Sequence, residues 1–341
     1  MSVFVSGATG FIAQHIVRKL LDENYKVIGS VRSQEKADRL SRQFNNPNLT
    51  LVIVKDIAEP GAFDEAFKTY GKEIKYVLHT ASPFYFETKD VEKELLIPAR
   101  NGTLGILESV KKYAADTVER FVITSSYAAI VNSSIAGDDS VTFTEQSWNP
   151  DTWEYAVEHT ERGYRTSKKI AEEAAWKFME ENKDKVKFEL TAVNPVFVFG
   201  PQLFDENVKS KLNTSCECIN AVLHTPRDAE VPMFSAGFID VRDVARAHLL
   251  AFQRDDLIGK RLLMFNGKWN SYDILHYLNE DFPVLKGKIP DPDPSKCIEI
   301  TQPGAKVDNS WTKKTLGFKF ISLRDTIHDT AAQILKHEGR L

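Results

Sequence analysis

The strongest constraint on the fold is an alternation of short apolar or β-branched runs with longer amphipathic stretches. Strands are predicted at residues 3–5, 27–31, 51–54, 76–78, 121–124 and 188–193. Helices are predicted between them at 11–21, 104–113 and 167–180. In the first of these helices, Ile12, Ile16 and Leu20 form one apolar stripe. Alternating strands and helices are typical of βαβ units, so we predict an α/β fold with a Rossmann-type doubly wound parallel sheet.

The alternation weakens after residue 194, which predicts a second structural part. A chain of 341 residues is long enough for two domains. We predict a Rossmann domain from residues 1–194 plus about 231–254, and a smaller C-terminal lobe from about 195–230 plus 255–341. The polar stretch 132–163 is too long for an ordinary connection, so a functional loop or lid is expected there.

Composition and charge exclude several classes of protein. The 44 Lys+Arg residues nearly balance 48 Asp+Glu residues, which argues against a nucleic-acid partner. No run reaches the roughly 18 apolar residues of a membrane span, so no membrane partner is expected. The N-terminus lacks a basic signal-peptide region, and three cysteines cannot staple a chain of this size. A reduced, cytoplasmic protein is therefore predicted.

The cysteine and histidine spacings give no sign of a metal site. Cys216 and Cys218 are one residue too close for a Cys-x-x-Cys redox or zinc motif, and Cys297 lies far from both. The eight histidines include no His-x-x-x-His pair. No metal is predicted.

A glycine-rich turn, Ser6-Gly7-Ala8-Thr9-Gly10-Phe11-Ile12-Ala13, follows the first predicted strand and opens the first helix. Glycine lets the backbone approach a pyrophosphate, and a helix N-terminus supplies N–H donors. A glycine turn without a ligand is the alternative. The strand–turn–helix context favours a dinucleotide site.

The second strand ends at Val31-Arg32-Ser33, where NAD-binding folds typically place Asp or Glu. Arg32, with Lys36 one helical turn on, suits a 2′-phosphate, so NADPH is predicted over NADH. The alternative is two solvated surface charges. Asp56 and Ile57 follow the third strand and are placed to meet an adenine, although Asp56 also fits a strand-end turn.

Tyr164 and Lys168 are four residues apart on a predicted helix and therefore share one face. A charged lysine lowers the pKa of a nearby phenol, which makes it a usable general acid. Tyr85 and Lys89 have the same spacing, but Lys89 lies in a charged stretch where a solvated lysine is expected. Ser126 ends a predicted strand upstream of this helix.

Parallel strands bind ligands at their carboxyl ends, and the predicted strand ends here carry polar and aromatic residues. They include Thr80-Ala81-Ser82, 124–126 and 194–198, accompanied by Phe84 and Tyr127. Together they predict a tight apolar pocket beside a nicotinamide. Plain core packing is the alternative for each aromatic residue.

These motifs, with Asn194-Pro195, Gly200-Pro201 and Phe238-Ile-Asp-Val-Arg-Asp-Val-Ala, make the whole chain resemble the extended short-chain dehydrogenases/reductases. Within that family it is similar to NADPH-dependent methylglyoxal and aldehyde reductases related to plant dihydroflavonol reductases. The resemblance implies that Tyr164 is the general acid, that Lys168 holds the nicotinamide ribose, and that Ser126 binds the substrate carbonyl.

The resemblance also implies a wider set of binding residues. The cofactor-binding residues that it implies are Gly7, Thr9, Gly10, Phe11, Ile12, Arg32, Lys36, Asp56, Ile57, Thr80, Ala81, Ser82, Tyr164, Lys168, Pro195, Val196, Phe197, Val198 and Ser215. The substrate residues that it implies are Phe84, Tyr127 and Phe197. Many relatives add a catalytic asparagine where this chain has Ala99, so no fourth catalytic residue is assigned.

The predicted function is NADPH-dependent reduction of a small carbonyl substrate: an aldehyde, an α-keto aldehyde such as methylglyoxal, a ketone or a diketone. A monomer or homodimer is expected. One alternative is an epimerase or dehydratase of the same fold, which keeps NAD bound and usually has an acid at the position of Arg32. The other is a non-catalytic NADPH sensor, which typically lacks the Tyr164 and Lys168 pair.

Overall fold

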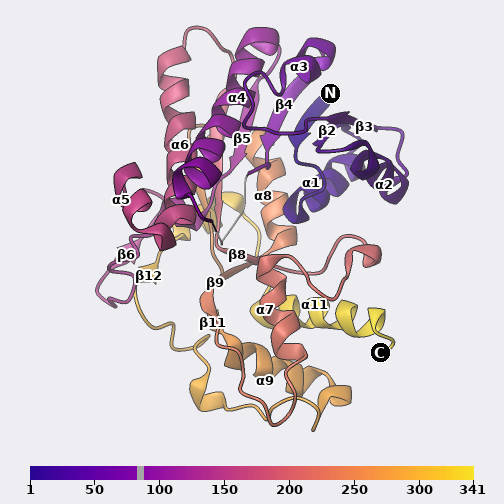
Figure 1. The fold of residues 1–341 in the computed structure, drawn as a ribbon, viewed down its shortest axis with the longest axis vertical. Helices are drawn as coiled ribbons and strands as arrows, with labels where there is room; N and C mark the ends of the chain where they lie inside the picture. The colour runs from indigo at the N-terminus through magenta and orange to yellow at the C-terminus, as the bar shows by residue number, and fades with distance from the viewer. Residues whose placement is uncertain (83–87) are drawn as a thin grey trace. The chain divides into compact units, whose positions relative to one another are not determined.

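The computed structural model describes residues 1–82 and 88–341, and its centre is one seven-stranded sheet. The strand order is β10-β7-β5-β4-β1-β2-β3 (Figure 1). Its strands are β1 (Ser2–Ser6), β2 (Lys26–Val31), β3 (Leu49–Ile53), β4 (Ile74–His79), β5 (Arg120–Thr124), β7 (Glu189–Pro195) and β10 (Arg261–Met264). In this order, every neighbouring pair of strands between β7 and β3 is parallel. The predicted α/β Rossmann-type fold is confirmed.

Contacts divide the chain into two compact units. The first, called here the Rossmann unit, comprises Met1–Ser134, Phe143–Asn194 and Ala245–Leu263. The second, the C-terminal unit, comprises Ile135–Thr142, Pro195–Val244 and Met264–Leu341. The chain thus returns to the Rossmann unit with Ala245–Leu263, whereas the sequence placed this return at about 231–254.

Helices flank the strands of the Rossmann unit. They are α1 (Phe11–Asp22), α2 (Gln34–Phe44), α3 (Asp64–Tyr70), α4 (Ile97–Ala114), α5 (Trp153–Glu158), α6 (Gly163–Asn182) and α8 (Val241–Gln253). Shorter helical turns are η1 (Glu92–Leu96), η2 (Tyr127–Ala129), η3 (Thr160–Arg162) and η5 (Asp255–Leu257). None of the helices among residues 1–82 and 88–341 is long and apolar enough to cross a membrane.

The core of the Rossmann unit explains why its strands are nearly continuous apolar runs. Phe4 of β1 packs against Phe67 of α3 with ring centroids 4.8 Å apart. Phe121 of β5 packs against Phe188 at 5.6 Å. Helices α4 and α6 pack along each other and share this core with the sheet. Burial of this kind is what a parallel sheet covered by helices requires.

The C-terminal unit has its own small sheet and core. Its sheet has the order β11-β9-β8, formed by β8 (Phe197–Phe199), β9 (Ser235–Asp240) and β11 (Lys268–Asn270). Its other elements are α7 (Thr214–Leu223), α9 (Ser271–Asp281), α10 (Ser310–Leu316), α11 (Leu323–His337), β12 (Lys306–Val307), η4 (Asp205–Asn207), η6 (Pro283–Leu285) and η7 (Pro294–Lys296). Trp269 is fully buried, and its ring lies 4.7 Å from that of Phe199.

The stretch 132–163, expected as a long loop, contains β6 (Thr142–Phe143), α5 and η3. These elements are too short to show a periodic pattern in the sequence. Trp153 of α5 donates its indole N–H to Glu92 at 2.8 Å, and Arg100 of α4 lies over the Trp153 ring at 5.0 Å. Tertiary contacts therefore hold α5 on the Rossmann unit, whereas Ile135–Thr142 belongs to the C-terminal unit.

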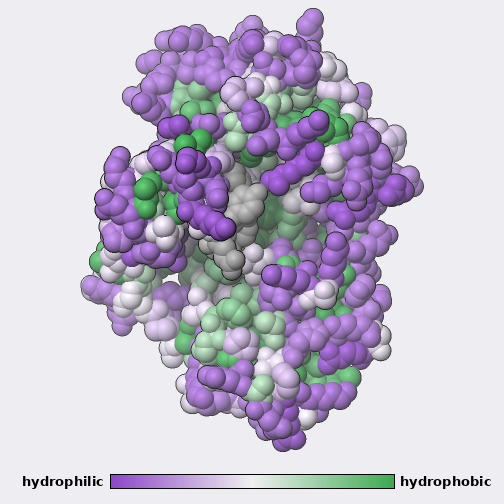
Figure 2. Space-filling view, viewed as in Figure 1, coloured by the Kyte–Doolittle hydropathy of each residue, from purple (hydrophilic) through white to green (hydrophobic). Residues whose placement is uncertain are grey.

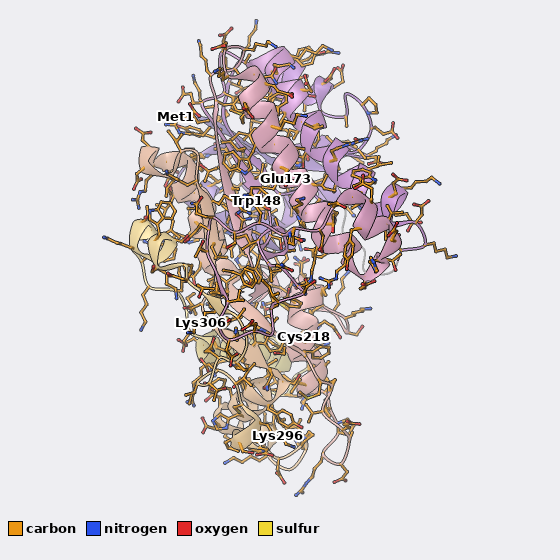
Figure 3. The ribbon with its side chains drawn as sticks, turned by 90° about the vertical axis from the view of Figure 1, so that its left-hand side faces the viewer. Met1, Trp148, Glu173, Cys218, Lys296 and Lys306 are labelled. Carbon is orange, nitrogen blue, oxygen red and sulfur yellow. The ribbon has the colours of Figure 1, made fainter. Side chains whose placement is uncertain are left out.

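The surface is mainly hydrophilic on the face seen in Figure 2, with apolar residues in separate patches. Figure 3 shows the side chains from another side, including Trp148 and Glu173 of the Rossmann unit. Among residues 1–82 and 88–341, no group of three or more His, Cys, Asp or Glu side chains is placed to hold a metal ion.

Candidate active site

The glycine turn lies where β1 runs into α1. Gly7 has a φ of +67°, and a Cβ on it would lie 3.0 Å from the Cβ of Ala81. Its N–H donates to Ser30 Oγ at 3.0 Å. Gly10 caps α1 with no side-chain hydrogen bond, and the first turn holds no acidic residue. The N–H groups of Ala8 and Gly10 are likewise used within the turn. The N–H groups of the first turn of α1 and the positive end of its dipole are therefore the part that fits a bound pyrophosphate.

The end of β2 presents the two predicted phosphate ligands. Arg32 is exposed directly after the strand, and Lys36 is half-buried in the first turn of α2. Ser33 begins this helix by accepting a hydrogen bond from the Lys36 N–H at 3.3 Å. Both cations therefore follow one strand end, one helical turn apart. Their role toward a 2′-phosphate stays a prediction.

The two residues after β3 that were predicted to meet an adenine, Asp56 and Ile57, both make contacts within the protein itself. Asp56 Oδ1 accepts a hydrogen bond from the Ala58 N–H at 2.9 Å, which is the strand-end turn considered as its alternative. Ile57 is buried beneath α4, since a Cβ on Gly102 would lie 2.9 Å from its Cδ1. Contact of either residue with an adenine stays a prediction.

A buried histidine that sequence reasoning did not single out ends β4. Ser6 Oγ accepts hydrogen bonds from the N–H groups of Thr80 and Ala81, both at 3.0 Å. The Ser6 hydroxyl can therefore donate its own hydrogen to His79 Nδ1, which lies 2.8 Å away. Because Nδ1 then accepts, the proton of the neutral His79 ring is on Nε2. Burial, with a contribution from the charge of Lys168, lowers the pKa of His79 to about 3. His79 is therefore neutral at physiological pH.

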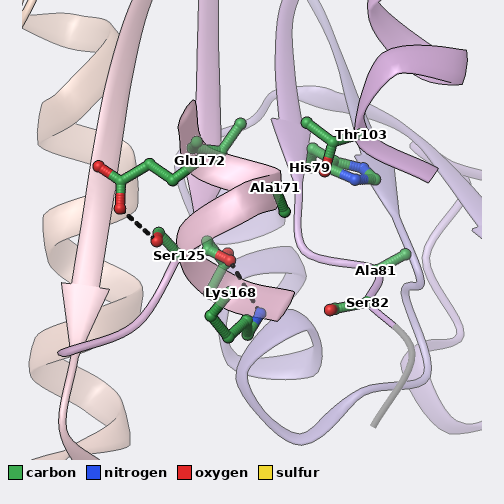
Figure 4. Close-up of a pocket in the computed structure, with 10 residues that line it drawn as sticks. His79, Ala81, Ser82, Thr103, Ser125, Lys168, Ala171 and Glu172 are labelled. Carbon is green, nitrogen blue, oxygen red and sulfur yellow. Dashed lines mark hydrogen bonds between the residues drawn. The ribbon is translucent and has the colours of Figure 1, made fainter. Parts of the chain in front are cut away.

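The three predicted catalytic residues come together from β5 and α6. Ser126 follows β5, and its Oγ accepts a hydrogen bond from the Ala128 N–H at 3.1 Å. The side chains of Ser126 and Tyr164 are hydrogen-bonded to each other. Lys168 Nζ donates to the Thr124 carbonyl at 3.5 Å (Figure 4). A hydroxyl, a phenol and an ammonium thus meet at the carboxyl end of the sheet.

The electrostatics of this trio differ from the expectation that Lys168 lowers the pKa of Tyr164. Burial raises the pKa of Tyr164 to about 12, opposed by the hydrogen bond to Ser126 and the charge of Arg165. Burial also lowers the pKa of Lys168 to about 8, opposed by the charge of Glu172. Burial outweighs the local charges at both groups. The phenol therefore holds its proton through neutral pH, and the ammonium is the group that titrates nearby.

A small cavity of about 20 Å³ adjoins the ammonium of Lys168. Its lining includes His79 from β4, Thr103 from α4, Thr124 from β5 and Glu172 from α6 (Figure 4). That volume is enough for about one water molecule. Ala81 and Ser82, predicted to border the cofactor, line the same cavity.

Several predicted residues lie elsewhere. Tyr127 is half-buried in η2, with its ring centroid 6.3 Å from that of Phe143 in an edge-to-face arrangement. Phe84 and Tyr85 lie outside the described residues. Four of the predicted residues belong to the C-terminal unit, at the start of its stretch Pro195–Val244: Pro195, Val196, Phe197 and Val198. Ser215 lies in the first turn of α7. Phe197 is 37% exposed there, so its side chain is available to a ligand.

Residues 3–264 of the chain match the model of the NAD dependent epimerase/dehydratase family. The NADPH-dependent methylglyoxal reductase of Saccharomyces cerevisiae is 58% identical over 342 residues, covering all of both chains. The crystal structure of yeast methylglyoxal/isovaleraldehyde reductase Gre2 complexed with NADPH matches all of both chains with a TM-score of 0.97. The Gre2 structure from Candida albicans in complex with NADPH is 45% identical over 99% of each chain, with a TM-score of 0.94.

Proposed function

Because the chain belongs to the NAD dependent epimerase/dehydratase family, we propose the reaction that its own residues support within that family. This reaction is NADPH-dependent reduction of an aldehyde or ketone. The chain is an oxidoreductase of the short-chain dehydrogenase/reductase type. The observation that carries the proposal is the meeting of Ser126, Tyr164 and Lys168 at the sheet end.

Each of the three side chains has a role that follows from its chemistry. NADPH, when bound, supplies the hydride to the carbonyl carbon. Tyr164 gives its phenolic proton to the carbonyl oxygen as negative charge develops there. The Ser126 hydroxyl hydrogen-bonds the same oxygen and stabilises that charge. Lys168 contributes a positive charge beside the nicotinamide ribose.

The cofactor residues are proposed on the geometry of the Rossmann unit. The glycine turn at Gly7 and Gly10 is proposed for the pyrophosphate, because it leads directly into the N-terminus of α1. Arg32 and Lys36 are proposed for the 2′-phosphate. The remaining predicted residues, from Thr80 to Ser82 and from the C-terminal unit, are proposed for the nicotinamide half. The Rossmann unit is thereby the NADPH-binding domain, and the C-terminal unit the substrate-binding lobe.

The proposed substrates are small carbonyl compounds: aldehydes, α-keto aldehydes, ketones and diketones. Methylglyoxal and isovaleraldehyde appear in the names of the yeast relative, which is identical to this chain at 58% of positions. The assignment of Tyr127, Phe197 and Phe84 to substrate contacts stays a prediction from the family resemblance. A cytoplasmic location and a monomeric or homodimeric state stay predictions from the sequence.

The direct test is loss of NADPH absorbance with purified protein and methylglyoxal, isovaleraldehyde or an aryl ketone, each run in parallel with NADH. We expect turnover with a strong preference for NADPH. Binding of NADPH without turnover of any of these substrates would favour the sensor alternative. Protein purified with tightly bound NAD would favour an epimerase or dehydratase.

Replacing Arg32 with aspartate is expected to raise the KM for NADPH by about 10- to 100-fold and to leave the KM for NADH nearly unchanged. Charge-assisted hydrogen bonds to a phosphate contribute about 1.5–3 kcal/mol each, and aspartate adds repulsion. The matched control is Arg42→Asp, an equal charge change on an exposed residue in the last turn of α2, the helix that follows Arg32. An unchanged cofactor ratio in Arg32→Asp would exclude the phosphate role.

A further inference from the structure

A buried carboxylate with no role in the reaction as described lies on α6, one helical turn beyond the lysine of the site. Glu172 is 1% exposed. Its Oε2 accepts hydrogen bonds from Ser125 Oγ at 2.5 Å and from Asn194 Nδ2 at 2.7 Å. Its Oε1 accepts from the Trp176 indole at 3.2 Å and from Arg261 Nε at 2.6 Å. These partners are all donors, which is the set that an ionised carboxylate takes.

The cation of this pair is held in place independently of the carboxylate. Arg261 of β10 is 8% exposed. Its Nη1 donates to the carbonyl oxygens of Glu145 at 2.9 Å and Ser147 at 2.6 Å. Its guanidinium carbon lies 3.8 Å from the centre of the Trp148 ring. The guanidinium is fixed from several sides, and it fixes Glu172 in turn.

Stability alone gives a weak reason for burying these charges. Desolvation of two ions offsets most of their attraction, and apolar side chains of similar volume are often as stabilising. A buried ion pair next to a proposed active site therefore calls for a functional explanation.

Glu172 is connected to the presentation of Ser126. The side chain of Ser125, the preceding residue, donates to Glu172, as the dashed line in Figure 4 shows. Asn194 Nδ2 donates both to Glu172 and to the Ser126 carbonyl oxygen at 3.2 Å. The backbone that carries the Ser126 hydroxyl is thus tied to the carboxylate by two routes.

Glu172 is also the acidic residue beside Lys168. Among the described residues that line the adjoining cavity, it is the sole carboxylate. The other polar side chains of this lining are neutral: His79, Ser82, Thr103, Thr124 and Ser125. The cation that is hydrogen-bonded to Glu172 is Arg261, which is not among the residues that line the cavity. The negative charge of Glu172 counteracts the effect of burial on Lys168.

We propose that Glu172 is a positioning residue of this reductase, whose carboxylate, locked by Arg261, holds the Ser126 strand end in place and keeps Lys168 charged in the working pH range. This inference rests on the proposed function, because Glu172 acts through Ser126 and Lys168.

The test is the pH dependence of kcat for Glu172→Gln, measured with saturating NADPH and methylglyoxal. Wild-type kcat is expected to fall as the pH rises through about 8, where Lys168 loses its charge. Removing the acid lowers the pKa of Lys168 further, so the alkaline fall is expected to move to lower pH by about one unit. KM for NADPH is expected to change less than kcat.

The matched control is Glu173→Gln, which removes the same charge from the next residue of α6. Glu173 is half-exposed and pairs with Lys169 at 3.3 Å, outside the network (Figure 3). Its pH profile is expected to match wild type. If the shift came only from removing a negative charge from α6, the pH profiles of both variants would shift. If Glu172 has the proposed role, only the profile of Glu172→Gln shifts.

A second variant guards against misfolding, since Glu172→Gln leaves Arg261 buried without a counter-charge. The double variant Glu172→Met/Arg261→Met removes both charges and keeps the volume apolar. We expect it to fold and to show the same direction of shift. A folded double variant with the wild-type profile would overturn the inference while leaving the proposed function intact. Absence of wild-type turnover would overturn both.

Discussion

Tyr164→Phe is expected to reduce kcat for carbonyl reduction by about 100- to 10,000-fold, the usual contribution of a positioned general acid. Phenylalanine keeps the ring and removes the phenolic proton that the developing alkoxide requires. The binding of NADPH is expected to stay within about threefold of wild type, because the glycine turn and Arg32 lie on other elements. Turnover is measured by NADPH absorbance, and cofactor binding by fluorescence titration.

The local structure makes this substitution a clean one. The Tyr164 hydroxyl is bonded to Ser126, which keeps a second hydrogen bond from the Ala128 N–H at 3.1 Å. Loss of the phenolic hydroxyl therefore leaves no buried polar group without a hydrogen-bond partner. The control is Tyr155→Phe on α5, whose ring is 37% exposed, with its centroid 4.2 Å from that of His159. A Tyr164→Phe variant with kcat within tenfold of the control would show that another group supplies the proton.

The pH dependence of kcat is not expected to follow the ordinary pKa of a tyrosine. Burial raises the pKa of Tyr164 to about 12, so the acid stays protonated through neutral and moderately alkaline pH. Burial lowers the pKa of Lys168 to about 8. The lysine, and not the tyrosine, is therefore expected to set the alkaline limit of the reaction.

Local patterns in the sequence were sufficient to predict the sheet and most of the proposed trio. Strands buried on both faces read as apolar runs, and the glycine turn is recognisable because it joins a strand to a helix. Tyr164 and Lys168 share a helix face by spacing alone. Ser126 lies at the end of a predicted strand, but its role in the trio is what the family resemblance implies. The parallel pairing of β4, β5 and β7 brings those strand ends to one edge of the sheet.

The polar network behind the trio could not be predicted, because its members are far apart in the sequence. Glu172 and Arg261 are separated by 89 positions, and Ser6 and His79 by 73. Which residues of distant strands meet depends on strand order, which local patterns do not encode. A spacing of four residues between Lys168 and Glu172 was the one available signal, and charges at that spacing are common on solvated helices.

The electrostatic expectation for Tyr164 failed for a related reason. The spacing of the lysine predicts a lowered phenol pKa, but the size of the burial effect depends on packing that no short motif reports. Lys168 moreover donates to the carbonyl of Thr124, which turns its ammonium toward the strand end. Burial of the Lys168 ammonium also affects the stability of the folded state.

Lys168→Met is expected to abolish turnover and to stabilise the protein at neutral pH. The pKa of Lys168 falls from its ordinary 10.5 to about 8, so the folded state holds this proton less tightly than the unfolded state does. That difference corresponds to about 3 kcal/mol of destabilisation wherever both states are charged. Methionine fills similar volume without a charge, and it relieves this cost.

The sign of the pH dependence distinguishes this explanation from a simple packing gain. Below about pH 8 the wild type carries the full cost of the buried charge, so the advantage of Lys168→Met is largest there. As the pH rises through 8 toward 10.5, the folded wild type loses its proton and the advantage shrinks. A packing gain would be independent of pH.

Thermal unfolding of both proteins between pH 6 and 10 tests this expectation, alongside turnover of methylglyoxal. We expect a melting temperature several degrees above wild type at neutral pH, converging with it under alkaline conditions. The control is Lys177→Met, a lysine of the same helix that is 74% exposed and bears no such cost. Equal or lower stability of Lys168→Met at pH 7 would mean that the ammonium is stabilised in the folded state. Where a site keeps a buried lysine charged for catalysis, removing that charge lowers the activity and raises the stability of the folded protein.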